Sequence, residues 1–256
     1  MPSVTNGFAL ERVSCMLCGS EHHSDIVATG SDFEYETSRI EFTFVRCSKC
    51  SHVYLNPPPT IESAPLIYPK TYYAVSGAHH RHARSVLERV KDAVVGRRIA
   101  QLVMDLPPNA SILEAGCGDG SLLLALRKHR NDLQLSGLDL QISDDARQRM
   151  SAARIDAIEG ALEEARLDRR FDMVVMNQVI EHLWHPRTGL LRANALLRPA
   201  GVLSISTPNL DGYDRRLFKA HAWGGYHFPR HLNLFTTESL SRLVEECGFR
   251  PLRVVC

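Results

Sequence analysis

The sequence has almost no net charge, no long apolar run and no leader-like start, and each absence narrows its possible functions. Its 256 residues carry 30 Lys and Arg against 29 Asp and Glu, which argues against nucleic-acid binding and against an acidic solvating tail. The longest apolar runs, such as Leu122–Leu126, are far too short to span a bilayer. The first residues lack a positive region followed by an apolar stretch. We therefore expect a cytoplasmic protein with no membrane partner.

The most informative segment runs from Glu114 through Gly116, Gly118 and Gly120, directly after an apolar run and before a leucine-rich stretch. Glycines at such a strand-to-helix junction let the main chain turn sharply and approach a nucleoside ligand closely. A dinucleotide-binding fingerprint would need its third glycine at Ser121, which disfavours a nicotinamide-dependent oxidoreductase. No Gly-Lys-Ser/Thr follows, so a phosphate-binding P-loop is excluded.

From about residue 107 onward, predicted strands alternate with predicted helices, which indicates an α/β fold with a doubly wound, Rossmann-like parallel sheet. A further strand is expected to begin at Arg250–Cys256. The pattern predicts strands near 111–115, 133–139, 154–159, 171–177 and 201–206, and helices near 120–130, 143–152, 186–198 and 236–247.

Asp139 ends the second of these strands, about twenty residues after the glycines. An acidic side chain there can accept hydrogen bonds from both hydroxyls of a bound ribose. The alternative is a helix N-terminal role, for which Ser143 and Asp144 are better placed.

Four segments in order resemble the motifs of class I S-adenosylmethionine (SAM) methyltransferases. They are the acidic residue with its glycines, Phe171–Val175 followed by Glu181-His182, Leu197–Leu203, and Ser206–Asn209. The resemblance covers residues 110–250 and is closest to the ubiquinone-pathway O-methyltransferase type. Such domains usually carry a seventh, antiparallel strand, which is missing here, so we expect either a shortened product or a core completed in another way.

The resemblance implies a role for each matching residue. Glu114 would lie near the methionine amino group, and the backbone of Gly116, Gly118 and Gly120 would pass under SAM. The ribose and adenine contacts would come from Asp139 and Leu140, and Asn177 would lie near the sulfonium.

Three histidines are candidate general bases for deprotonating a methyl acceptor, namely His182, His227 and His231. Arg230, between the last two, could clamp an anionic substrate. The structural alternative is that these side chains pack or cap a helix.

Seven cysteines are present, and four form two Cys-x-x-Cys pairs, Cys15/Cys18 and Cys47/Cys50. Such pairs can hold one tetrahedral structural zinc ion, although a redox dithiol is the alternative. Residues 1–59 are predicted to form a small zinc-ribbon-like unit, residues 60–106 a helical connector or lid, and residues 107–256 the SAM-binding domain. The combination resembles bacterial methyltransferases with an N-terminal zinc-binding region, including sugar C-methyltransferases and enzymes of polysaccharide or natural-product pathways.

We therefore expect a SAM-dependent methyltransferase that modifies O, N or C of a small molecule or a carrier-linked intermediate. Two alternatives remain open at this point. One is an RNA-modifying methyltransferase that uses the zinc-ribbon-like unit to hold its substrate, and the other is a non-catalytic scaffold that retains the cofactor fold. The oligomeric state is left open.

Overall fold

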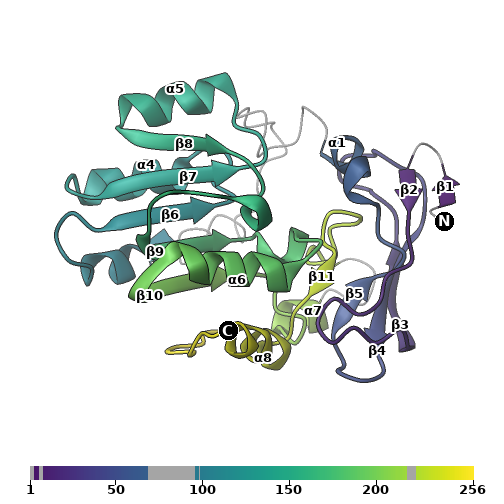
Figure 1. Cartoon of the computed structure of the whole chain (residues 1–256). Coiled ribbons are helices and arrows are strands. Elements are labelled where there is room, and N and C mark those ends of the chain that lie inside the picture. The colour runs from purple at the N-terminus through teal and green to yellow at the C-terminus, as the bar shows by residue number, and fades with distance from the viewer. Residues whose placement is uncertain (1–2, 6–7, 69–95, 98, 218–222) are drawn as a thin grey trace. The chain divides into compact units, whose positions relative to one another are not determined.

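The computed structural model describes residues 3–5, 8–68, 96–97, 99–217 and 223–256 (Figure 1). The chain forms two compact units that are not contiguous in sequence. Unit 1 comprises Met1–Pro69, Ile180–Leu191 and Thr207–Cys256, and unit 2 comprises Lys70–Val179 and Arg192–Ser206. The amino-terminal segment therefore shares a unit with two later segments, and the boundaries expected at residues 59 and 106 stay predictions. Most of the expected connector lies outside the described residues, although residues 99–104 are helical.

Unit 2 contains the alternating strands and helices that the sequence predicts, with bounds that differ by only a few residues. Its elements are β6 (Ser111–Ala115), α4 (Ser121–His129), β7 (Gln134–Asp139), α5 (Asp144–Ala152), β8 (Ile155–Glu159), η2 (Leu162–Glu164), β9 (Phe171–Asn177) and β10 (Leu197–Ser206). Helix α6 (Pro186–Leu196) begins in unit 1 and ends in unit 2.

The five strands of unit 2 form one parallel sheet in the order β10-β9-β6-β7-β8. The chain builds outward from β6 to β8 and then crosses to β9 and β10 on the other side. The order therefore reverses between β6 and β9, and a ligand of such a sheet binds beyond the carboxyl ends of the strands at this point. The predicted doubly wound sheet is confirmed.

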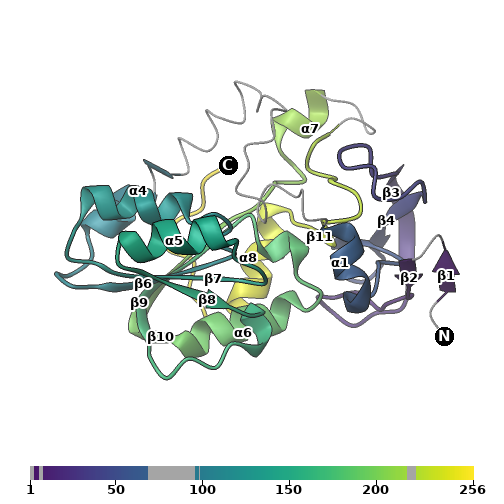
Figure 2. The same ribbon diagram turned by 90° about the horizontal axis from the view of Figure 1, so that it is seen from above.

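The central strands are mostly buried on both faces, as expected where helices cover a parallel sheet. All five residues of β6 are buried, and Met173–Met176 of β9 are buried as well. Figure 2 shows α4 and α5 on one face of this sheet. Leu123, Leu126 and Met150 from these helices pack into the core with Ile112 and Leu135.

Unit 1 is built from short elements drawn from three parts of the chain. They are β1 (Ser3–Thr5), β2 (Phe8–Leu10), β3 (His23–Gly30), β4 (Phe42–Cys47), β5 (Val53–Leu55), η1 (Ile61–Ser63), α1 (Ala64–Ile67), η3 (Ile180–His182), α7 (Tyr213–Leu217), β11 (Asn233–Leu234) and α8 (Thr237–Glu246). Strand β4 ends at Cys47, the first cysteine of the second pair.

An antiparallel sheet in the order β11-β5-β4-β3 organises unit 1. Aromatic side chains from distant segments fill its core, and the ring of Phe44 lies 5.8 Å from that of Tyr226 and 5.0 Å from that of Phe228, centroid to centroid. The strand expected at Arg250–Cys256 is wrong. This segment pairs with no described strand, and its apolar side chains, such as Leu252 at 74% exposure, point to solvent.

Candidate functional site

The carboxyl edge of the unit 2 sheet brings three of the predicted site residues together. Ala115 of β6 pairs with Leu138 of β7 on one side and with Met176 of β9 on the other. The residues that follow these three are Gly116, Asp139 and Asn177, and neighbouring strands lie about 4.8 Å apart. The three predicted residues therefore line adjacent positions at the point where the strand order reverses.

The glycine loop after β6 is required by backbone shape and by packing. Gly116 and Gly120 have left-handed φ angles of 72° and 73°. A Cβ atom on Gly116 would lie 2.3 Å from Cγ2 of Val179, and one on Gly120 would lie 2.7 Å from Cγ of Met150. Sequence reasoning assigned these glycines to ligand approach, whereas here they also leave room for the protein's own side chains.

Two carboxylates face this loop, and each has a raised pKa. The Asp139 Oδ2 atom accepts a 2.7 Å hydrogen bond from the backbone N–H of Gly118, and burial raises the pKa of Asp139. Glu114 is 4% exposed, and among the described residues its Oε2 atom has no hydrogen-bond partner. Burial first, and then the charges of Asp139 and Asp119, raise the pKa of Glu114 well above its usual value. A bound cation would compensate this buried carboxylate.

The remaining residues of this edge differ in exposure. Leu140, directly after Asp139, is 60% exposed, which is high for a large apolar side chain beside a strand end. Asn177 is half-buried at the last position of β9. Gln178, which the sequence analysis did not single out, has a left-handed φ of 55°, and its backbone N–H donates to the carbonyl of Ser206.

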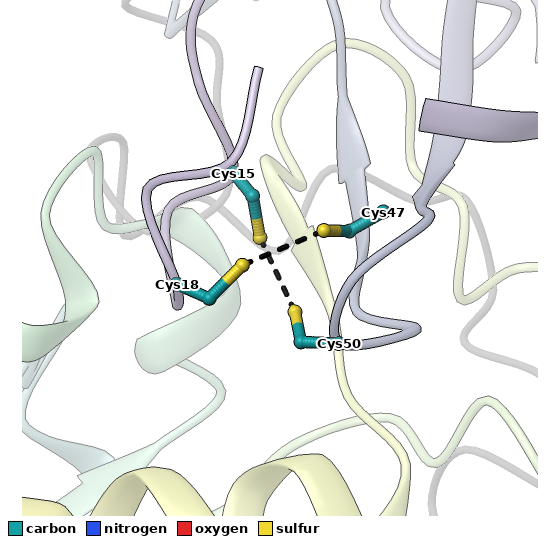
Figure 3. A group of neighbouring side chains, drawn as sticks. All are labelled: Cys15, Cys18, Cys47 and Cys50. Carbon is teal, nitrogen blue, oxygen red and sulfur yellow. Dashed lines mark hydrogen bonds between the residues drawn. The ribbon is translucent and has the colours of Figure 1, made fainter. Parts of the chain in front are cut away.

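The four paired cysteines of unit 1 meet at one point (Figure 3). The Sγ atoms of Cys15 and Cys50 are 3.5 Å apart, as are those of Cys18 and Cys47, and all four lie within 4.8 Å of one another. Tetrahedral zinc with Zn–S bonds of about 2.3 Å requires S···S separations of about 3.8 Å. The cluster therefore has the size and the donor set that zinc prefers.

The two cysteine pairs are held by equivalent turns. The backbone N–H of Gly19 donates to the carbonyl of Cys15, and that of Ser51 donates to the carbonyl of Cys47. Gly19 and Ser51 are both left-handed, with φ of 70° and 61°. In the second turn burial opposes ionisation, but the N–H groups of Cys50 and Lys49 donate to the Cys47 sulfur, and its pKa falls to about 7. In the first turn the N–H groups of Cys18 and Leu17 likewise favour the Cys15 thiolate, but burial prevails and raises the pKa of Cys15.

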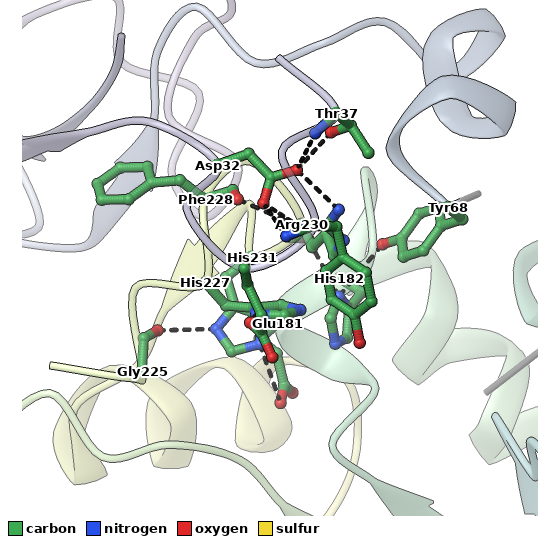
Figure 4. Close-up of polar contacts among 12 residues, drawn as sticks. Asp32, Thr37, Tyr68, Glu181, His182, Gly225, His227, Phe228, Arg230 and His231 are labelled. Carbon is green, nitrogen blue, oxygen red and sulfur yellow. Dashed lines mark hydrogen bonds and ion pairs between the residues drawn. The ribbon is translucent and has the colours of Figure 1, made fainter. Parts of the chain in front are cut away.

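The three predicted histidines cluster in unit 1 together with Glu181 (Figure 4). The rings of His182 and His231 lie 4.7 Å apart, and those of His227 and His231 lie 5.0 Å apart, between centroids. His182 Nδ1 is 3.0 Å from the carbonyl of Arg230 and 3.2 Å from the hydroxyl of Tyr68.

Burial sets the protonation of most of this cluster. Burial lowers the pKa of His182 to about 3 and that of His231 well below its usual value. Burial also raises the pKa of Glu181 to about 8. At neutral pH these two imidazoles are neutral, and Glu181 is mostly protonated.

The sequence-based expectation that Arg230 clamps a substrate is wrong. Both Arg230 and Asp32 have fully buried side chains, and the guanidinium donates to the two Asp32 oxygens at 3.0 and 2.9 Å. Thr37 donates to the same carboxylate, and Arg230 lies 4.3 Å above the ring of Tyr35. The charge of Arg230 is thus neutralised inside unit 1.

Asp32 and Glu34 are residues of this cluster that sequence reasoning missed. Glu34 lies 2.5 Å from Nδ1 of His227 through its Oε2 atom. Both carboxylates come from the segment between β3 and β4, almost 200 residues before their partners, so no local pattern marks them.

Three features together define a Rossmann-like nucleoside-binding fold. They are the order of the five parallel strands, the glycine loop after the central strand, and the acidic residue that ends the next strand. A family model for a methyltransferase domain matches residues 80–254. The chain therefore belongs to this methyltransferase domain family.

Similar proteins include named methyltransferases. The chain is 37% identical over 145 residues to a probable S-adenosylmethionine-dependent methyltransferase of Mycolicibacterium smegmatis, covering 54% of this chain and 51% of that protein. It is 25% identical over 172 residues to the malonyl-[acyl-carrier protein] O-methyltransferase of Priestia megaterium, covering 66% and 57%. The chain thus spans about half the length of the curated relatives it matches.

A solved structure shows the same fold over most of the chain. It is the 1,6-didemethyltoxoflavin-N1-methyltransferase of Burkholderia thailandensis with bound S-adenosylhomocysteine, at 18% identity and a TM-score of 0.58, covering 88% of this chain and 90% of that one. Within the described part of the chain, no helix has the length and apolarity needed to cross a membrane.

Proposed function

We propose that the protein is a SAM-dependent methyltransferase that acts on a small molecule or a carrier-linked intermediate. The observation that carries the proposal is the carboxyl edge of the unit 2 sheet. There a left-handed glycine loop lies between the carboxylates of Glu114 and Asp139. Glu114 is buried, and its Oε2 atom has no hydrogen-bond partner among the described residues, while Asp139 ends β7. SAM carries an ammonium group, which the Glu114 carboxylate can bind, and a ribose, whose hydroxyls can donate hydrogen bonds to the Asp139 carboxylate. Membership of the methyltransferase domain family supports the same activity.

The residues of this edge have distinct roles in the proposal. Glu114 binds the ammonium of the methionine part, which offsets the cost of its burial. The glycine loop passes under the cofactor, and Asp139 accepts hydrogen bonds from the ribose hydroxyls. Leu140 covers the adenine with its exposed side chain, and Asn177 lies near the sulfonium.

Bound SAM supplies an activated methyl group for in-line displacement. The protein's task is to align the acceptor atom with that group, exclude water and accept the acceptor's proton. We propose that the proton acceptor comes from the histidine cluster of His182, His227 and His231. In the sequence Glu181 and His182 follow Asn177, the last residue of β9, by four and five positions.

We further propose that Cys15, Cys18, Cys47 and Cys50 hold a structural zinc ion. Four thiolates complete a tetrahedral shell and leave no position for a reacting water, so the ion stabilises unit 1 without taking part in the chemistry. Free thiols persist in a reducing compartment, and this is consistent with a protein that acts in the cytoplasm.

The acceptor is proposed only as a class. The named relatives include a malonyl-[acyl-carrier protein] O-methyltransferase and an enzyme that methylates a ring nitrogen of 1,6-didemethyltoxoflavin. Carrier-linked and free small molecules thus both occur among similar proteins. An RNA acceptor is disfavoured by the balance of 30 basic and 29 acidic residues, because phosphate contacts need a basic surface.

Isothermal titration of the full chain with SAM and with S-adenosylhomocysteine tests this proposal. We expect wild type to bind both, and Asp139→Ala to weaken binding about 10- to 100-fold, because hydrogen bonds to a charged acceptor are lost. Asp144→Ala is the matched control, since it removes an exposed carboxylate five positions later at the start of α5. Failure of wild type to bind either compound would leave only a non-catalytic scaffold. Equal affinity in Asp139→Ala would refute the ribose assignment.

A further inference from the structure

The segment between β3 and β4 contributes two carboxylates to the turn that carries His227 and His231. Asp32 binds Arg230, and Glu34 binds His227. Asp32 and Glu34 are two positions apart, their partners Arg230 and His227 are three positions apart, and all four residues belong to unit 1. One short segment of the cysteine-containing amino-terminal part therefore fixes the conformation of the histidine-bearing turn.

The Asp32–Arg230 pair supplies the rigidity of this arrangement. Both side chains are fully buried, the pair is bidentate, and Thr37 also donates to Asp32. Bidentate geometry restricts the relative orientation of the two backbones as well as their separation. Glu34 thus approaches His227 from a fixed direction.

The carboxylate of Glu34 lies against one particular nitrogen of the His227 ring. Its Oε2 atom is 2.5 Å from Nδ1, and the backbone of His227 has a left-handed φ of 36°. A carboxylate at Nδ1 holds the proton on that nitrogen, and the lone pair is then on Nε2. Burial opposes ionisation of Glu34, but the hydrogen bond with His227 and the positive charge of Arg230 favour the carboxylate, and the pKa of Glu34 is lowered.

Within the part of the chain that the structure describes, His227 is the one of the three candidate bases with an acidic side chain at its Nδ1. His182 and His231 place Nδ1 against the backbone carbonyls of Arg230 and Gly225, at 3.0 and 2.7 Å. A carbonyl fixes a tautomer, but a carboxylate also compensates the positive charge that appears when Nε2 takes a proton.

The other groups that face His227 come from three parts of unit 1. Tyr35 lies edge-on at 6.3 Å between ring centroids, and His182 and His231 lie at 6.3 and 5.0 Å. Arg230 contributes the nearest fixed positive charge, which its pairing with Asp32 offsets. Among the described residues, Glu34 is the carboxylate in contact with this ring.

We propose that Glu34 is a positioning residue that makes His227 the proton acceptor of methyl transfer. The inference rests on the proposed function. The acceptor atom bonds to the methyl group as the methyl–sulfur bond breaks, and the acceptor's proton passes to Nε2 of His227. Glu34 compensates the resulting imidazolium, which later releases the proton to water. The amino-terminal part of the chain thus takes part in the chemistry through Glu34, in addition to the structural role proposed for its cysteines.

Two measurements on the zinc-loaded full chain test the proposal without an acceptor. Long-range ¹H–¹⁵N spectra of the histidine rings report which nitrogen carries the proton, with His227→Gln assigning the signals. The second measurement is the rate at which diethyl pyrocarbonate modifies each histidine, with the modified peptides quantified by mass spectrometry. This rate reports how readily Nε2 donates its electron pair. Glu34→Gln is the test variant. Glu36→Gln, an exposed residue of the same segment with no recorded hydrogen bond or ion pair among the described residues, is the control.

We expect the Nδ1–H form of His227 in wild type and a rate of modification that falls about fivefold or more in Glu34→Gln, because the charged hydrogen bond is lost. The control should match wild type. An Nε2–H form in wild type, or an unchanged or faster rate in Glu34→Gln, would overturn the proposal, since a merely structural contact would expose the ring when removed. S-adenosylhomocysteine binding, measured in parallel, should be equal in all variants. Failure of wild type to bind S-adenosylhomocysteine would refute the proposed function, whereas the histidine measurements would still be valid.

Discussion

Gly116 offers a quantitative test of the loop geometry, because its substitution combines two separable costs. Gly116→Ala places a Cβ atom 2.3 Å from Cγ2 of Val179, at a φ of 72°. A side chain in the left-handed region costs about 1–2 kcal/mol. Overpacking against the buried Val179 costs about 1–3 kcal/mol more. We therefore expect a loss of about 2–5 kcal/mol in the free energy of unfolding.

A double-mutant cycle with Val179→Ala separates the two costs. That change removes the atoms that collide with the new Cβ, and by itself it costs about 1.5 kcal/mol for two methyl-sized groups. In this background Gly116→Ala should cost only the backbone term of about 1–2 kcal/mol. The assay is urea unfolding followed by circular dichroism, with the slope of the transition checked for each variant.

Gly224→Ala is the control for the substitution itself, since a Cβ there meets nothing within 4 Å and the backbone is not left-handed. It should stay within about 1 kcal/mol of wild type. An equal cost of Gly116→Ala in both Val179 backgrounds would refute the proposed collision. A cost indistinguishable from that of Gly224→Ala would refute the loop geometry altogether.

Three further predictions concern the charges and thiols of unit 1. The Arg230 contact lowers the pKa of Asp32 to about 2 from 3.8, so it adds about 2 kcal/mol of stability above pH 4 that is lost as pH falls through 2. Asp32→Asn should remove that acid loss and cost about 3–5 kcal/mol at pH 7, because the buried Arg230 loses its carboxylate partner, and parallel stability–pH curves would contradict this. Burial raises the pKa of Glu181 from 4.5 to about 8, so wild type should lose stability as pH rises between these values while Glu181→Gln does not. An equal change in the free energy of unfolding between pH 5 and pH 8 in wild type and in Glu181→Gln, each measured by urea unfolding, would count against a buried, protonated Glu181. Cys47→Ser should lower the zinc content measured by native mass spectrometry, together with the melting temperature of unit 1, and full zinc retention would exclude a four-thiolate site.

The sheet of unit 2 was predictable because short apolar-rich strand segments alternate with longer helical segments along the sequence. The run that ends at Ala115 is buried on both faces, and its carboxyl end opens directly into the glycine loop. Parallel strands align their carboxyl ends, so Asp139 and Asn177 could be placed at one edge from sequence positions alone. The Cys-x-x-Cys spacing similarly predicted a four-sulfur cluster.

The composition of unit 1 was not predictable in the same way. Strand β11 has two residues, too few for any periodicity, and it pairs with β5 across about 180 residues of sequence. Asp32 and Glu34 lie in a segment with no chemical motif, and only the folded chain brings them to Arg230 and His227. The sequence suggested Arg230 as a ligand for an anionic substrate, because it lies between two candidate catalytic histidines. In the structure, Arg230 instead forms an ion pair with the buried carboxylate of Asp32. Local patterns specify elements, but such long-range pairs leave no local signal.

A crystal structure of the full chain with S-adenosylhomocysteine tests the central claim most directly. We expect the nucleoside above the Gly116–Gly120 loop, with its ribose hydroxyls about 2.6–3.2 Å from the Asp139 carboxylate and its ammonium beside Glu114. A ligand bound away from the carboxyl edge of β6 and β7, or one whose ribose does not reach Asp139, would contradict the account.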